Sequence, residues 1–196
     1  MKVLISFFIL LLSACQSFDF DEYAVLDTPE LDHKLPHYHL SIKNPTIVMP
    51  GSSGYLKSTE RDYRAIINSF FIKEFEDKVI DITKPVFGNM ELIPHIVVKE
   101  TGIFKYAFPS GITLFTICLL GFPATEYTAN VSLELRITDK HGAVLHRYTA
   151  KASDSELNAL YYGYYEDDTK VAALTIAYKT ALSDLIKQIK SIDNYK

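Results

Sequence analysis

Alternation of apolar and polar residues predicts a β-hairpin in the second half of the chain. In VSLELRITD, one face carries every second residue: Val131, Leu133, Leu135 and Ile137. Residues 139–142, Asp-Lys-His-Gly, follow with a composition typical of turns. On the return strand, every second side chain then points inward. These are Val144, His146, Tyr148 and Ala150, or, in the alternate register, the residues between them. A period of two on both sides of a turn indicates a hairpin.

Two shorter segments predict further strands. Tyr38, Leu40 and Ile42 alternate with polar residues, and residues 45–54 then break the pattern with prolines and glycines. The segment MELIPHIVVKETG is also strand-like. Its Pro94 predicts a bend or an edge position, because proline donates no hydrogen bond to a neighbouring strand.

Apolar residues at helical spacing predict two helices. The first runs from about Thr59 to Asp77, with the apolar positions Tyr63, Ile66, Ile67, Phe70, Phe71 and Phe75. The second runs from about Asp168 to Ile192. Its stripe is Val171, Leu174, Tyr178, Leu182, Leu185 and Ile189, accompanied by four alanines.

The order of these elements predicts an α+β fold. Strands and helices are not strictly alternating, and the hairpin is necessarily antiparallel. We therefore expect a mainly antiparallel sheet of about four strands, with two helices packed on one face. Such packing would bury both helical stripes.

The most apolar internal stretch is residues 112–122, ITLFTICLLGF. It is about half as long as a membrane-spanning helix, and Pro109 and Pro123 flank it. One interpretation is a buried central strand. The other is a loop or short helix displayed to a partner protein or to a bilayer, since exposed apolar patches on secreted domains usually bind something. Its candidate contact residues are Phe115, Leu119, Leu120 and Phe122.

A tyrosine cluster precedes the last helix in the sequence NALYYGYYEDD. Tyrosines are enriched at protein interfaces, and their rings also stack on sugars. They pack equally well over a sheet. Tyr161, Tyr162, Tyr164 and Tyr165 are therefore candidate contact residues, with a structural role as the alternative.

The first fifteen residues, MKVLISFFILLLSAC, have the order of a secretory signal: one lysine, an apolar run and small residues. Residues 12–15, Leu-Ser-Ala-Cys, resemble the lipobox of bacterial lipoproteins. This resemblance implies cleavage before Cys15 and lipidation of that cysteine. By similarity to the sorting rule of enteric bacteria, Gln16 after the cysteine implies an outer-membrane location, facing the periplasm. The expected organisation is a signal peptide at 1–14, a lipidated cysteine and tether at 15–36, and one periplasmic domain at 37–196.

Composition and motifs argue against several classes of function. The net charge of −4 leaves no basic face for nucleic acid. His33, His37 and His39 lie near Asp32, but the prolines around them favour surface residues over a metal site. Motifs of hydrolases, P-loop proteins and dinucleotide-binding proteins do not occur in the sequence. We expect no enzyme activity, no cofactor and no metal.

The segments SGITLFTICLLGFP, VSLELRITDKHGAVLHRYTAK and YYGYY, followed by an alanine-rich helix, resemble small lipoproteins of the bacterial envelope. The order of elements is similar to the periplasmic domain of the curli secretion lipoprotein CsgG and to the lipopolysaccharide-assembly lipoprotein LptE. These resemblances imply a non-catalytic binding or accessory component of an envelope complex, whose partner is an envelope protein or a second copy. The alternative is a lipoprotein that binds a hydrophobic or glycan ligand.

Overall fold

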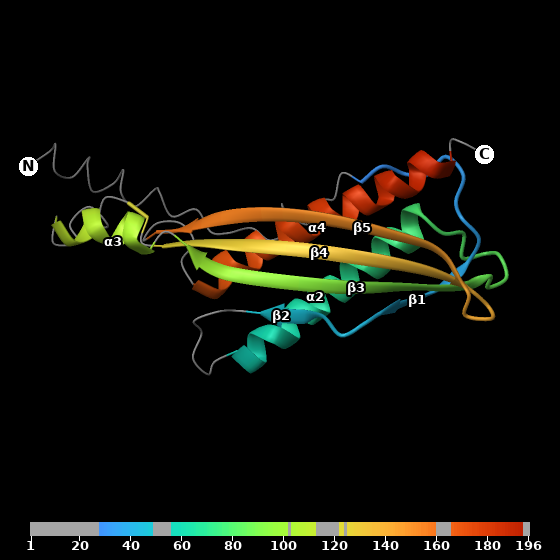
Figure 1. The fold of residues 1–196 in the computed structure, drawn as a ribbon, viewed down its shortest axis with the longest axis horizontal. Coiled ribbons are helices and arrows are strands. Elements are labelled where there is room, and N and C mark those ends of the chain that lie inside the picture. Colours follow the sequence, from blue (N-terminus) through green and yellow to red (C-terminus); the bar gives the residue numbers. More distant parts are fainter. Residues whose placement is uncertain are drawn as a thin grey trace, which may run out of the picture.

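The computed structural model describes residues 28–48, 56–101, 103–112, 122–123, 125–159 and 166–193. Its elements, in chain order, are β1 (Tyr38–Ile42), β2 (Thr46–Val48), α2 (Leu56–Lys78), β3 (Gly88–Thr101), α3 (Ile103–Ile112), β4 (Thr125–Asp139), β5 (Val144–Asn158) and α4 (Glu166–Asp193). Figure 1 shows a long sheet with α2 and α4 behind it and α3 beyond one end. The predicted α+β class is confirmed.

Five strands form one mixed sheet in the order β1-β3-β4-β5, with β2 also pairing with β3. The β3–β4 and β4–β5 pairs are antiparallel, whereas β1 and β2 run parallel to β3. The chain returns from β2 to β3 through α2, as a parallel connection requires. The sheet is thus mostly antiparallel, as predicted, with one strand more than expected.

Pro94 explains why two short strands, rather than one long strand, line β3. The Lys43 amide donates to the Leu92 carbonyl at 2.8 Å. The backbone N–H and C=O groups of even-numbered β3 residues therefore point toward β1 and β2 here. The next donor on that side is residue 94, a proline without an N–H. β1 ends at Ile42 and β2 begins at Thr46, on either side of this gap.

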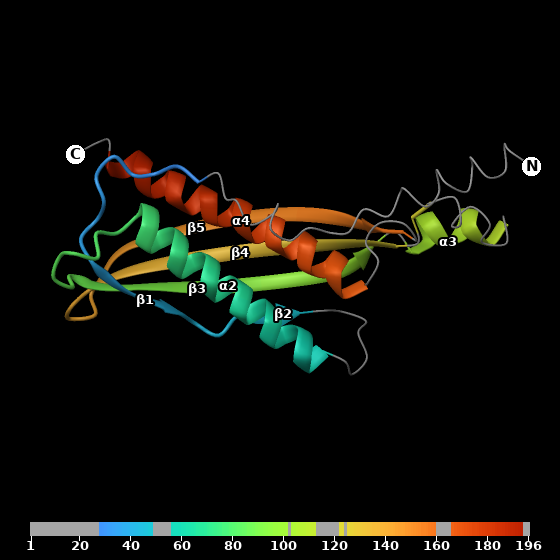
Figure 2. The ribbon, with the colours of Figure 1, turned by 180° about the vertical axis from the view of Figure 1, so that it is seen from behind.

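Both long helices cover the same face of the sheet (Figure 2). The inward rows pair Met90 with Ile137, Leu92 with Leu135 and Ile96 with Val131. The helices add buried side chains from their stripes: Ile67, Phe71, Phe75, Leu174, Tyr178, Leu182, Leu185, Ile186 and Ile189. Tyr178 ties them together, since its hydroxyl donates to the Ile67 carbonyl at 3.2 Å. Burial raises the pKa of this phenol.

The hairpin is confirmed, with one correction to its register. Tyr148 and Ala150 face the core as predicted. Val144 does not: the register shifts between Ile137 and Thr138, and Val144 pairs with the outward-facing Thr138. A bulge moves a side chain to the other face, which the alternating pattern does not reveal. In the turn itself, Gly142 has φ of 83°, as its position predicts.

Residues 28–36, which the sequence analysis assigned to the tether, pack against the domain. Leu31 is 4% exposed, and its amide donates to the Lys78 carbonyl at the end of α2. The Thr28 hydroxyl donates to Glu74 at 2.6 Å, and Lys190 of α4 binds Glu30 and Asp32. The sequence of this segment does not predict the packing, because a single buried leucine among polar residues and prolines gives no periodic apolar pattern.

Candidate functional site

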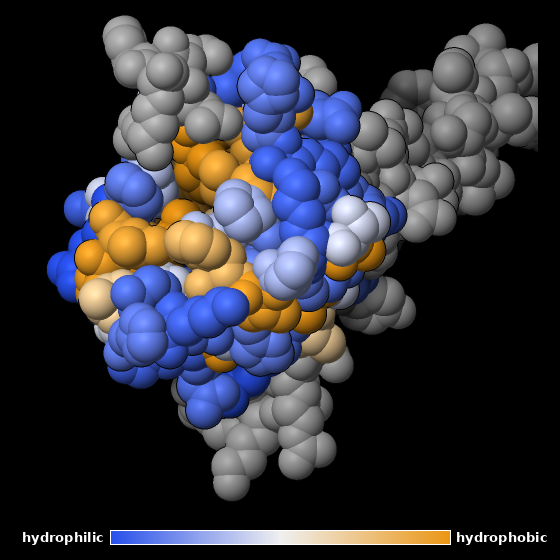
Figure 3. All heavy atoms as spheres, turned by 90° about the vertical axis from the view of Figure 1, so that its right-hand side faces the viewer, coloured by the Kyte–Doolittle hydropathy of each residue, from blue (hydrophilic) through white to orange (hydrophobic). Residues whose placement is uncertain are grey.

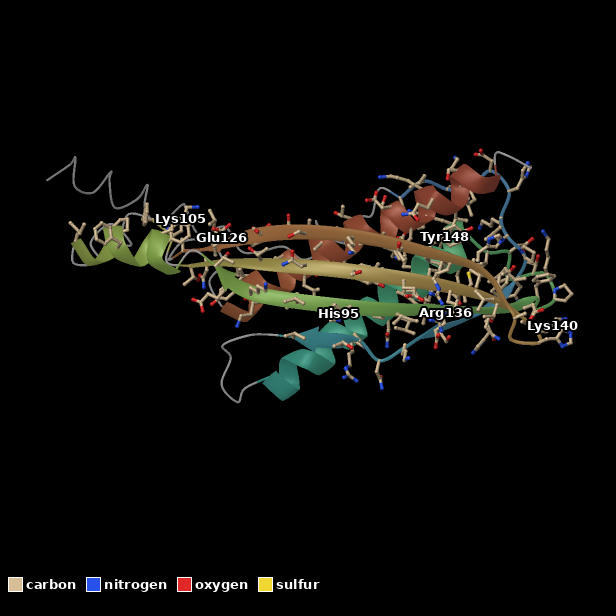
Figure 4. All side chains as sticks on the ribbon, viewed as in Figure 1. His95, Lys105, Glu126, Arg136, Lys140 and Tyr148 are labelled. Atoms are coloured by element: carbon tan, nitrogen blue, oxygen red, sulfur yellow. The ribbon has the colours of Figure 1, made fainter. Side chains whose placement is uncertain are left out.

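The end of the sheet that carries α3 is the first candidate site. Figure 1 shows α3 beyond the ends of β3 and β4, away from α2 and α4. The Tyr106 ring packs edge-on against the Phe122 ring, with 5.9 Å between the ring centroids. The Tyr106 hydroxyl donates to the Glu126 carboxylate at 3.2 Å. Lys105 adds a longer ion pair to Glu126, at 3.7 Å. Figure 4 shows Lys105 and Glu126 together where α3 meets the sheet.

The far part of α3 displays large apolar side chains. Phe108 is 72% exposed and Ile112 is 67% exposed. They are four residues apart, so they share one face of the helix. Pro109, predicted from the sequence to flank the apolar stretch, lies within α3. Lys105 is the one charged residue of α3. This end therefore presents an apolar surface.

Phe122 is the only predicted contact residue for which the structure gives a position. It is half-buried and packs on Tyr106, so it connects the apolar stretch to the base of α3. Phe115, Leu119 and Leu120 lie outside the described residues, as do Cys15 and the cluster Tyr161, Tyr162, Tyr164 and Tyr165. The choice between a core strand and a displayed segment at 113–121 stays open. Ile112, at its start, is helical and exposed.

The sheet face opposite the helices carries two rows of paired polar side chains. In one row, Arg136 binds Glu91 and Glu134, and Arg147 binds Glu134. In the other, hydroxyls connect Thr101 to Thr128 at 3.0 Å and Thr128 to Ser155 at 2.8 Å. Figure 4 places His95 and Arg136 on this part of the sheet. Most of these groups pair with one another, but the buried Nε of Arg136 has no hydrogen-bond partner among the described residues.

A shallow hollow of about 450 Å³ lies between the two rows. Its lining comes from the middle of β3, β4 and β5: His95, Val97, Asn130, Val131, Ser132, Lys151, Ala152 and Ser153. None of these residues is acidic. The Lys151 ammonium makes no ion pair within the described part of the chain. The hollow is thus a second candidate site, with both polar and apolar groups in its lining.

At the opposite end of the sheet, a second group of apolar side chains is exposed. Ile82, Val86 and Phe87 come from the loop after α2, and Val144 and Leu145 from the start of β5; we call these five the turn-end patch. Figure 3 views this end and shows apolar residues gathered among polar ones. These side chains come from two segments far apart in the sequence, so no single stretch predicts them together. The sequence signal is an apolar loop in DITKPVFG.

The histidines near Asp32 do not converge. His37 Nδ1 lies 3.1 Å from the Lys84 carbonyl, and Asp32 pairs with Lys190. Among the described residues, no three His, Cys, Asp or Glu side chains gather closely enough to hold a metal ion. No described helix has both the length and the apolar character needed to span a bilayer.

Two carboxyl groups near the α3 end of β5 are desolvated. Asp154 and Glu156 alternate with outward-facing serines and lie in register with Ala129 and Tyr127, on the face that the helices cover. Burial raises the pKa of both groups, and the charge of Asp154 raises that of Glu156 further. Asp154 Oδ2 is buried without a hydrogen-bond donor among the described residues.

No family model matches the chain, and no curated protein matches its sequence. Several solved structures are similar, and three of them are described here. A proposed lipoprotein of Caulobacter crescentus is 13% identical, covering 74% of this chain and 84% of its own, with a TM-score of 0.28. A minor lipoprotein of Acinetobacter baumannii is 12% identical over 80% and 93%, with a TM-score of 0.37.

The third is a proposed neuraminyllactose-binding hemagglutinin homologue of Helicobacter pylori. It is 12% identical, covers 86% of this chain and 89% of its own, and has a TM-score of 0.37. These neighbours thus include lipoproteins of Gram-negative bacteria. Similarity this low does not carry a function from one protein to another.

Proposed function

We propose that this chain is an envelope lipoprotein, anchored through Cys15 in the outer membrane, that acts in the periplasm as a non-catalytic accessory component of a protein complex. One observation carries the proposal: α3 extends beyond the sheet and displays Phe108 and Ile112 to solvent. Exposed apolar side chains on a secreted domain cost solubility and are typical of a contact surface.

We include in the proposed contact surface the predicted contact residues that follow α3 in the sequence: Phe115, Leu119, Leu120 and Phe122. The segment from Thr101 to Thr125 contains no acidic residue and a single lysine, in a chain with 24 acidic residues. Cores of protein interfaces are depleted in charge in this way. The partner is accordingly an envelope protein, or a second copy of this chain, with an apolar surface of its own.

In-cell crosslinking tests the proposal. The photoreactive residue benzoylphenylalanine replaces Phe108 in one strain and Ile72, a partly exposed α2 residue, in a control strain. We expect a discrete protein adduct from position 108 only, and its loss when Ile112→Asp is added. Absence of a protein adduct at position 108, or the same adducts from both positions, would contradict the proposal.

The hollow on the open sheet face favours a second candidate, a ligand-binding lipoprotein. Its amide, hydroxyl and ammonium groups suit a glycan better than a hydrophobic ligand, because they would stay unpaired against an apolar molecule. Native mass spectrometry separates the two functions. A monomer that carries a small molecule, lost in a Lys151→Ala variant, supports the second.

A further inference from the structure

The position where the tether joins the domain determines which end of the molecule can meet the bilayer. The described chain begins at Thr28, and this residue is held by two side chains near the C-terminal end of α2. Its hydroxyl donates to Glu74 and accepts from Lys78, the last residue of that helix. Two residues later, Lys190 near the end of α4 binds the Glu30 carbonyl.

Figures 1 and 2 place these helix ends at the same end of the molecule as the β4–β5 turn, opposite α3. The tether therefore joins the domain on the side nearer the turn-end patch.

The length of the tether makes the two ends of the sheet unequal. Thirteen residue steps separate Cys15 from Thr28, a reach of about 45 Å when fully extended, but of only about 20 Å for a flexible coil. β4 alone has 15 residues, which corresponds to about 50 Å of strand. Since the tether joins the domain on the side of α2 and α4 where both helices end, α3 lies farther from the anchor than the turn-end patch does.

The chemistry of the turn end also suits a lipid surface. Ile82 and Val144 are 57% and 54% exposed, and Val86, Phe87 and Leu145 lie with them at this end. Two acidic residues there are engaged within the protein. Asp81 accepts from the Thr83 hydroxyl and pairs with Lys84, and the Asp139 carboxylate accepts from the His141 and Ala143 amides.

Lys140, in contrast, makes no ion pair in the described part of the chain and lies at the tip in Figure 4. An apolar group with a free lysine beside it is suited to the boundary between acyl chains and phosphates.

We propose that the turn-end patch rests on the bilayer that holds the acyl chains of Cys15, with its apolar side chains at the acyl boundary and Lys140 among the lipid phosphates. This inference rests on the proposed lipidation. It adds an orientation: the sheet stands away from the membrane, and α3 is presented at the far end to the protein partner.

Tryptophan fluorescence tests the orientation without background, because the chain contains no tryptophan. Ile82→Trp and Phe108→Trp each create a single reporter, one at each end of the sheet. The lipidated proteins are purified from host membranes and incorporated into vesicles of phosphatidylethanolamine and phosphatidylglycerol, with or without lipids brominated near the head group. Circular dichroism verifies that both variants fold.

We expect the tryptophan at position 82 to emit at shorter wavelength in vesicles and to lose most of its emission to brominated lipid. The tryptophan at position 108 should show neither effect. Equal quenching at both positions, quenching at 108 alone, or none at 82 would overturn the orientation. A further Val144→Asp change should reduce the quenching at position 82.

The same experiment separates failure of this inference from failure of the proposed function. A protein without acyl chains on Cys15 would not be incorporated through its anchor, and the lipoprotein proposal itself would then fail. A protein that is incorporated but shows no difference between positions 82 and 108 contradicts only the orientation.

Discussion

Glu74 holds together the place where the tether meets the domain, so its replacement by glutamine is informative. Its carboxylate is 8% exposed, accepts from Thr28 and pairs with Lys78 at 2.9 Å. It also acts on a second cation. Lys179 of α4 is 7% exposed, and its ammonium is buried without a hydrogen-bond acceptor among the described residues. Burial lowers the pKa of Lys179, and the charge of Glu74 opposes this effect.

The expected cost of Glu74→Gln follows from these contacts. Breaking a fully buried ion pair costs about 3–5 kcal/mol, but Lys78 is one-quarter exposed and recovers water. We expect a loss of about 2 kcal/mol in the free energy of unfolding, or about 4–8 °C in Tm for a domain of this size.

Lys179→Met should instead stabilise the domain by about 1 kcal/mol, because it removes a desolvated charge that the Phe70 ring at 4.8 Å and the carboxylate of Glu74 compensate only in part.

A double-mutant cycle in urea, followed by circular dichroism, measures the coupling between Glu74 and Lys179. If the carboxylate neutralises the buried ammonium, Glu74→Gln should cost about 1 kcal/mol less in the Lys179→Met background. The matched control is Asp184→Asn, which removes a carboxylate from an exposed pair with Lys187 and should cost well below about 1 kcal/mol. A coupling energy of zero, or destabilisation by Lys179→Met, would refute this account of the α2–α4 interface.

Two further predictions concern the sheet. Gly88→Ala should cost about 3 kcal/mol, because the new Cβ would lie 2.0 Å from the Thr138 carbonyl oxygen; Gly111→Ala, with open space around it, is the control, and equal costs in urea titrations would contradict the packing described. Asp154→Asn should stabilise the domain at neutral pH by less than about 1 kcal/mol. The pKa of Asp154 is raised in the folded state. The wild-type domain therefore loses stability as the pH rises from 3.8, the ordinary pKa of this group, through its folded pKa. The gain should therefore vanish below that window, and a gain that persists in acid would exclude titration as its cause.

Most of the fold was predictable from local patterns. Val131, Leu133 and Leu135 reveal the face of β4 because their alternation coincides with burial. The α4 stripe is equally direct, since each apolar position meets the sheet or α2. The features that were missed depend on partners distant in sequence. The start of α2 at Leu56, rather than near Thr59, has no local signal, and the bulge that turns Val144 outward depends on pairing with β4.

The candidate sites were less predictable, for physical reasons. The composition of residues 112–122 predicts a contact segment but does not point to Phe108, which lies before that segment and is more exposed than Ile112. The hollow around Lys151 arises only when three strands align. The turn-end patch arises only when the loop after α2 meets the hairpin turn. The lipidation of Cys15, the tyrosine contacts and the resemblance to CsgG and LptE stay predictions.

The most direct test of the whole account is mass spectrometry of the amino-terminal peptide from protein isolated from its native host. The account predicts a peptide that begins at Cys15 and carries a thioether-linked diacylglycerol and an amide-linked fatty acid. A peptide that begins at Met1, or a Cys15 without any fatty acid, would contradict it.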